Sequence, residues 1–157
     1  MNVLISKDPL FLNDLRIGMA WTSQPVAITA DAIIAFAKEY DPQPFHIDPA
    51  AAASGHFGGL IASGWHVAAL VMRQFVEARP FGSSPILGLG VNDLRWLKPV
   101  RPGDILKVRG EIVELKPSSS KPDRGVVRSE IQVYNQSGEV VMSFLSSTQL
   151  PLRKETA

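Results

Sequence analysis

The amino-acid sequence predicts a single α+β domain in which an antiparallel sheet curls around one long helix. Helical periodicity is confined to the first half of the chain, and alternating apolar and polar residues follow in the second half. The chain has 157 residues, 45% of them hydrophobic, which is enough for one core of ordinary size. We therefore expect one domain over residues 1–157, with a flexible tail from about residue 151.

Two helices are predicted before the middle of the chain. Thr29 is a suitable N-cap for a helix over residues 30–40, whose apolar side chains recur at three- and four-residue steps. Asp48 followed by Pro49 is typical of a helix start, so a short helix is expected from there to Ala53. The residues between these helices are expected to form a loop.

A longer helix is predicted over residues 64–78. No charged residue occurs in it before Arg73, so its N-terminal half is apolar nearly all round. Such a helix is normally enclosed by other elements. The residues expected along one of its faces are Trp65, Ala68, Ala69, Met72 and Val76.

The second half of the chain is predicted to form strands. The expected ranges are 21–28 (the earliest strand, in the first half), 86–98, 104–116, 127–134 and 139–150. The alternation slips between Val91 and Leu94, which indicates a β-bulge, and Asn135 to Gly138 is a turn signal that favours a hairpin. Trp21 and Trp96 are expected to lie in the core.

Composition and charge argue against several functional classes. The 16 basic and 15 acidic residues nearly cancel, which disfavours a nucleic-acid partner or a polybasic membrane surface. The absence of cysteine excludes disulfides, thiolate nucleophiles and iron–sulfur clusters. No secretory signal is evident, and the apolar run at 67–72 is too short to cross a bilayer, so we expect a cytoplasmic protein.

The segment YDPQPFHIDP at residues 40–49 is the richest in chemical groups. Its prolines hold the backbone extended, so that Asp41 and His46 could converge on one point. A carboxylate beside an imidazole is a common acid–base pair. The alternative, from spacing alone, is that both residues only cap helices or satisfy backbone groups.

The start of the long helix is a second candidate feature. Ser63 and Gly64 stand where the helix offers free N–H groups and the positive end of its dipole. Such donors could stabilise negative charge on a thioester oxygen. An ordinary Ser-Gly helix start is the alternative, and the residues alone favour it.

Three ordered blocks carry a resemblance to a known family. They are DPQPFHID at 41–48, FGGLIASG at 57–64 and LRWLKPVRPGD at 94–104. Between residues 28 and 106 the chain resembles the MaoC-like dehydratases, which include the (R)-specific enoyl-CoA hydratases.

The resemblance implies a hotdog fold and a hydratase or dehydratase acting on an enoyl-CoA or 3-hydroxyacyl-CoA thioester, in fatty acid metabolism. Water would be added or eliminated with syn geometry. Asp41 and His46 would be the catalytic pair, and the Gly64 amide would lie in the oxyanion hole. No metal or redox cofactor is implied, because coenzyme A arrives as part of the substrate.

The sequence departs from the family pattern around the site. Tyr40 replaces a usual glycine, Gln43 replaces a usual asparagine, and Ser63 stands where histidine is common. Trp65 is larger than the usual residue and is expected to narrow the acyl pocket. We expect Gln43, Ser63 and Trp65 to contact substrate.

Basic residues near the end of the 86–98 strand are candidates for binding coenzyme A phosphates. Arg95 and Lys98 are the predicted contacts, and solvated strand-end charge is the alternative for each. The three histidines, spaced ten residues apart, match no common metal-ligand pattern, so no metal site is expected.

A homodimer or higher homo-oligomer is expected, because a lone hotdog sheet exposes an edge and a groove that a second copy would cover. Two other functions remain open. One is a hotdog acyl-CoA thioesterase, although the long helix carries no carboxylate before Glu77. The other is a non-catalytic acyl-thioester binding module, which the replacements Tyr40 and Gln43 keep possible.

Overall fold

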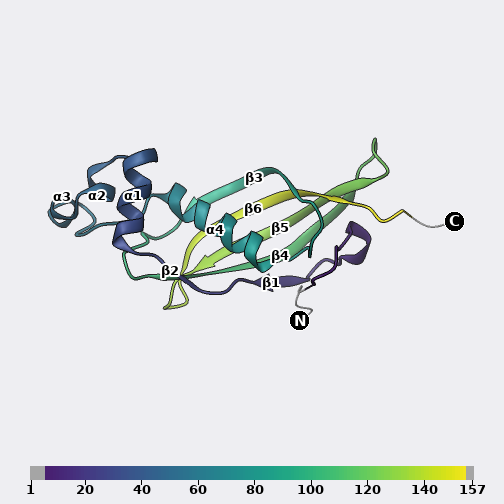
Figure 1. Cartoon of the computed structure of the whole chain (residues 1–157), viewed down its shortest axis with the longest axis horizontal. Coiled ribbons are helices and arrows are strands. Elements are labelled where there is room, and N and C mark those ends of the chain that lie inside the picture. The colour runs from purple at the N-terminus through teal and green to yellow at the C-terminus, as the bar shows by residue number, and fades with distance from the viewer. Residues whose placement is uncertain (1–5, 155–157) are drawn as a thin grey trace.

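The computed structural model describes residues 6–154 (Figure 1). Its elements, in chain order, are η1 (Leu12–Asp14), β1 (Ala20–Thr22), β2 (Val26–Ala27), α1 (Ala30–Tyr40), α2 (Pro44–Ile47), α3 (Pro49–Ala53), α4 (Gly64–Ala78), β3 (Leu87–Trp96), β4 (Ile105–Pro117), β5 (Arg124–Tyr134) and β6 (Val140–Pro151).

The strands form one curved antiparallel sheet in the order β1-β4-β5-β6-β3, with β2 pairing to β4 off this path. Figure 1 shows α4 lying along one face of the sheet, while α1, α2 and α3 gather beyond one end of it. A long helix cradled by a curved antiparallel sheet is the hotdog fold, so the predicted fold class is confirmed.

The core lies between α4 and the inner face of the sheet. On β4, Leu106 and Val108 are fully buried, as the alternating pattern predicts. Trp21 is buried as expected, and its ring packs edge-on against Phe75 of α4 with centroids 5.4 Å apart. Its indole lies over Gly110 of β4, where a Cβ atom would come within 2.2 Å of Nε1. Glycine at this position therefore allows the tryptophan to reach the sheet.

The outer face of α4 is open, contrary to prediction. Trp65, Met72 and Val76 are 59%, 54% and 54% exposed. The sheet covers only one side of the helix, and within the described residues nothing covers the other. Trp96 was predicted to lie in the core and is 46% exposed, because it ends β3 at the edge of the sheet.

A buried glutamine of α4 forms hydrogen bonds with β4 and with the link between β1 and β2. The Gln74 side-chain amide donates to the Ser23 hydroxyl, the Gln24 carbonyl and the Leu106 carbonyl, each at 3.0 Å. Periodicity alone did not identify this polar residue as part of the buried face. Two of its acceptors lie in the link between β1 and β2 and the third lies in β4, and they satisfy the buried Nε2 group.

Two local predictions differ from the structure and one is confirmed. The single strand expected at 21–28 is divided into β1 and β2, with Pro25 and its missing N–H between them. Residues 44–47, expected within a loop, form the short helix α2, and Pro44 is its first residue. The predicted bulge is confirmed by a register shift between Asn92 and Arg95.

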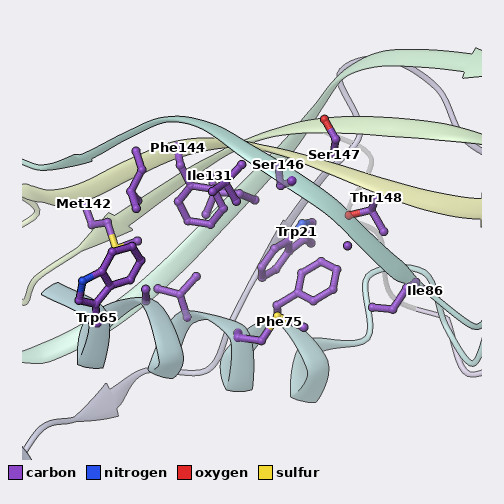
Figure 2. Close-up of a pocket in the computed structure, with 17 residues that line it drawn as sticks. Trp21, Trp65, Phe75, Ile86, Ile131, Met142, Phe144, Ser146, Ser147 and Thr148 are labelled. Carbon is purple, nitrogen blue, oxygen red and sulfur yellow. The ribbon is translucent and has the colours of Figure 1, made fainter. Parts of the chain in front are cut away.

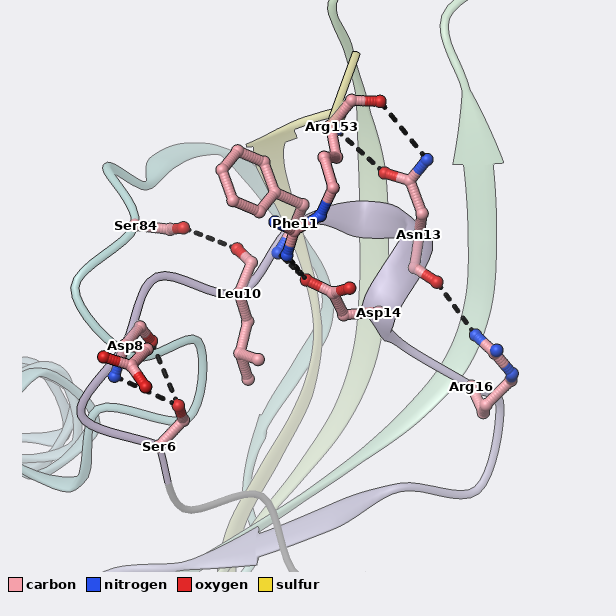
Figure 3. Close-up of polar contacts among 9 residues, drawn as sticks. All are labelled: Ser6, Asp8, Leu10, Phe11, Asn13, Asp14, Arg16, Ser84 and Arg153. Atoms are coloured by element: carbon pink, nitrogen blue, oxygen red, sulfur yellow. Dashed lines mark hydrogen bonds and ion pairs between the residues drawn. The ribbon is translucent and has the colours of Figure 1, made fainter. Parts of the chain in front are cut away.

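The segment around η1 contacts Arg153, which follows β6, as Figure 3 shows. The Asp14 carboxylate accepts from the Phe11 backbone N–H and from Arg153, each at 2.9 Å, and these contacts hold its pKa below the usual range. Asn13 Oδ1 accepts from the Arg153 backbone N–H at 2.9 Å. The tail expected from residue 151 is thus held at its beginning, and residues 155–157 lie outside the described part.

Candidate functional site

The turn after α1 brings the predicted acid–base pair together. Asp41 is the C-cap of α1, and its backbone N–H donates to the Ala37 carbonyl at 2.9 Å. Pro44 then starts α2, which carries His46 back toward α1. The distance from Asp41 Oδ2 to His46 Nε2 is 3.3 Å. The Asp41 backbone makes the helix-end contact, so its carboxylate is free to face the imidazole.

The imidazole of His46 is buried and oriented by the backbone. Its Nδ1 lies 2.7 Å from the Ile61 carbonyl oxygen. A carbonyl only accepts, so we assign the ring proton to Nδ1. In the neutral ring, Nε2 then presents its lone pair toward the Asp41 carboxylate. Two acceptors that face one another can both bind the same water molecule through its two O–H groups.

Two side chains donate hydrogen bonds to the Asp41 carboxylate. Gln43 Nε2 donates to Oδ1 at 2.7 Å, and the Ser63 hydroxyl donates to Oδ2 at 2.7 Å. Gln43, then Ser63 and the nearby His46, lower the pKa of Asp41, while partial burial opposes them. Gln43 and Ser63 were predicted to contact substrate. Their polar atoms contact Asp41 instead, a role that chain spacing did not indicate because Ser63 lies 22 residues away.

The start of α4 is built around Ser63 and Gly64. Ser63 is fully buried and is the N-cap, with its hydroxyl oxygen accepting from the Trp65 N–H at 3.3 Å. Gly64 is the first residue of α4, and its N–H has no hydrogen-bond partner among the described residues. A Cβ atom on Gly64 would lie 2.4 Å from the Trp96 ring. Glycine is therefore required for the indole to sit against the helix start.

Asp41, His46 and Gly64 line one cavity of about 360 Å³. Among the residues predicted to contact substrate, Trp65 and Lys98 line it too. The Lys98 ammonium is paired with Glu139, and Arg95 is exposed on β3 outside the cavity lining.

A second hollow of about 470 Å³ lies between α4 and the sheet. Figure 2 shows apolar side chains along it, including Phe75, Ile131 and Phe144. Trp65 lines this hollow as well as the cavity that holds the acid–base pair.

His66, near the start of α4, is packed against an aromatic ring, and its buried Nδ1 has no hydrogen-bond partner among the described residues. His66 is buried and stacks on Phe36 with ring centroids 4.7 Å apart, and burial lowers its pKa. Within residues 6–154, no three His, Asp or Glu side chains are grouped closely enough to hold a metal ion. None of the described helices combines the length and the apolar character needed to span a bilayer.

Comparison with known proteins gives a consistent group of relatives. The family model described as "MaoC like domain" matches residues 14–135. A crystal structure of a MaoC-like dehydratase from Rhodospirillum rubrum is 43% identical, with a TM-score of 0.84, covering 92% of this chain and 99% of that one. The R-hydratase PhaJ1 from Pseudomonas aeruginosa is 28% identical, with a TM-score of 0.74 and coverage of 95% and 94%. Mesaconyl-CoA hydratase of Cereibacter sphaeroides is 40% identical over 60 residues, which are 38% of this chain and 17% of that protein.

Proposed function

This chain belongs to the MaoC-like domain family, and from that premise we propose that it is a hydro-lyase acting on enoyl-CoA or 3-hydroxyacyl-CoA thioesters. The observation that carries the proposal is the single cavity lined by Asp41, His46 and the free amide of Gly64. Relatives that are R-hydratases or act on a CoA thioester support the same class of reaction.

In the proposed hydration, Asp41 and His46 Nε2 hold one water molecule beside C3 of the enoyl group. The thioester carbonyl accepts from the Gly64 N–H. As the water oxygen bonds to C3, His46 Nε2 takes a proton from it, and negative charge moves onto the thioester oxygen. The Gly64 amide and the dipole of α4 stabilise that charge. The ionised Asp41 stabilises the imidazolium that forms.

Protonation of C2 completes the addition. The imidazolium of His46 returns its proton to C2, so that water has been added across the double bond and the ring is neutral again. Because one face of the substrate meets the pair, the hydroxyl and the proton arrive on the same side, which is syn addition. Dehydration follows the same steps in reverse. Addition of water is redox-neutral, and every proton in this scheme comes from water, so the proposed steps use neither a redox cofactor nor a metal, and coenzyme A enters with the substrate.

A homodimer is part of the proposal. The edge strand β3 has exposed apolar side chains, among them Leu87, Leu89 and Val91 at 51–56%. A second copy that pairs along this edge would cover them and leave no open strand there. Light scattering on the purified protein tests this by giving a mass twice that of the 17.1 kDa chain.

Hydration of crotonyl-CoA, followed by the loss of enoyl absorbance, tests the reaction and the pair. We expect Asp41→Asn and His46→Gln each to lower kcat/KM by at least about a hundredfold, the usual size of acid–base contributions. Asp48→Asn and His56→Gln are matched controls, because Asp48 caps α3 and His56 is exposed and outside the cavity lining.

The outcome separates the proposed function from the other candidates. Wild-type rates in both site variants would refute the assignment of the pair. Release of free thiol without loss of the double bond would identify a thioesterase. Tight binding of acyl-CoA without turnover of enoyl-CoA would identify a binding module.

A further inference from the structure

We infer that Trp65 and Trp96 form a wall that restricts the proposed hydratase to short acyl chains. The two indoles, called the indole wall below, meet edge to face with ring centroids 5.1 Å apart. The inference rests on the proposed function and adds the substrate class, which is enoyl thioesters of about four carbons rather than eight.

The indole wall stands directly beside the proposed carbonyl site. Trp96 comes from the end of β3, and its ring fills the space where a Cβ atom of Gly64 would be, at 2.4 Å. Trp65 follows Gly64 in α4. A thioester whose oxygen accepts from the Gly64 N–H is therefore next to both indoles.

The wall separates two hollows of different chemistry. The catalytic cavity of about 360 Å³ contains Asp41 and His46, and Trp96 lines it. The hollow of about 470 Å³ contains mainly apolar side chains. Among the described residues, Trp65 alone lines both. Each hollow thus ends at this ring.

The apolar hollow extends away from the catalytic pair. Figure 2 shows the Trp65 indole at one end, beside Met142, whereas Ile86 and Thr148 lie at the opposite end. A long acyl chain that started at Gly64 would gain this apolar surface only by passing the wall. With both rings in place, carbons beyond the first few lack that contact, so longer chains are disfavoured.

Both indoles are partly exposed, at 59% for Trp65 and 46% for Trp96. Removing either ring therefore deletes little of the core, and the variants are expected to fold. Trp65→Ala joins the two hollows directly, whereas Trp96→Ala widens only the side next to Gly64. Met72→Ala is the control, because Met72 lines the apolar hollow on the far side of the wall.

The test compares crotonyl-CoA with trans-2-octenoyl-CoA in the wild type and the three variants. We expect wild-type kcat/KM to favour crotonyl-CoA, and Trp65→Ala to shift the ratio of the two values toward octenoyl-CoA by at least about tenfold, on the scale of a methylene in an apolar pocket. Trp96→Ala should shift the ratio less, and Met72→Ala should leave it unchanged.

Binding of butyryl-CoA and octanoyl-CoA, measured by calorimetry on the same proteins, distinguishes failure of the indole wall from failure of the proposed function. If Trp65→Ala shifts the ratio of dissociation constants but no enoyl-CoA is hydrated, the proposed function fails and the wall stands. If Trp65→Ala shifts neither ratio, or the wild type prefers the eight-carbon chain, the inference is overturned even when crotonyl-CoA is hydrated.

Discussion

The Ser63 hydroxyl offers a sharp test of how the site controls Asp41. Ser63→Ala removes the donor at 2.7 Å from Asp41 Oδ2 and leaves Gln43 and His46 in place. A hydrogen bond to a charged group contributes about 1.5–3 kcal/mol. Because this hydrogen bond favours the ionised carboxylate, its loss raises the pKa of Asp41 toward its ordinary value. Because the Asp41 side chain is 20% exposed, water replaces part of the lost bond, and we expect an effect at the lower end of that energy range.

The sign of the effect follows from the direction of the shift. In the wild type the pKa of Asp41 is lowered, first by Gln43 and then by Ser63, so the carboxylate stays ionised well into acid. Removing Ser63 raises that pKa, so the acid limb of kcat/KM for enoyl-CoA hydration should move to higher pH. At a pH far above the limb, the ionisation state of Asp41 is the same in both proteins.

Stability changes in the same direction. The lowered pKa of Asp41 stabilises the folded chain above the unfolded value near 3.8, and this contribution is lost as pH falls through the folded pKa. Ser63→Ala should therefore be less stable than the wild type at neutral pH, with the difference shrinking in acid. Loss of the N-cap of α4 adds a decrease of about 1 kcal/mol that does not depend on pH.

The assay is a pH–rate profile, accompanied by thermal melts at two pH values. Ser63→Thr keeps a hydroxyl and should leave the acid limb closer to that of the wild type. If folded Ser63→Ala shows an acid limb at the wild-type position, the hydroxyl does not influence Asp41 and the reasoning is refuted.

Two further predictions test the site and the chain ends. Gly64→Ala places a Cβ 2.4 Å from the Trp96 ring, so the rate of crotonyl-CoA hydration should fall at least about tenfold. Adding Trp96→Ala should restore part of the rate, and equal losses in the single and double variants would contradict this. Arg153→Ala removes an exposed ion pair with Asp14 and a cation 4.4 Å from the Phe11 ring centroid. The free energy of unfolding, measured in urea, should drop by about 0.5–1.5 kcal/mol, and by less at acid pH where Asp14 is protonated. An unchanged urea midpoint would contradict this prediction.

Local signals in the sequence were sufficient to predict much of the fold. Thr29 caps α1 through a 3.1 Å bond from the Ala32 N–H, and Asp48 caps α3, both as predicted. The bounds of α1 and α4 are those that periodicity indicated. Caps and periodicity depend on residues within a few positions of one another, so a single chain carries them completely.

The details that depend on distant contacts could not be predicted in this way. The resemblance suggested Asp41 and His46 as a pair, but no spacing rule connects Ser63 to Asp41 or Trp96 to Gly64. The open face of α4 was also missed. Its apolar residues look the same in sequence whether the sheet of one chain or a second copy covers them.

The contact between Arg153 and Asn13 joins residues 140 positions apart, which has a consequence for biosynthesis. The segment around η1 is synthesised 140 residues before its partner, which is made only when translation has passed residue 153. The contact between η1 and this end of the sheet can therefore form only after nearly the whole domain has been made. Contacts between residues so far apart in sequence slow folding relative to a domain whose contacts are mainly local. During that interval Phe11 and Asp14 lack this arginine.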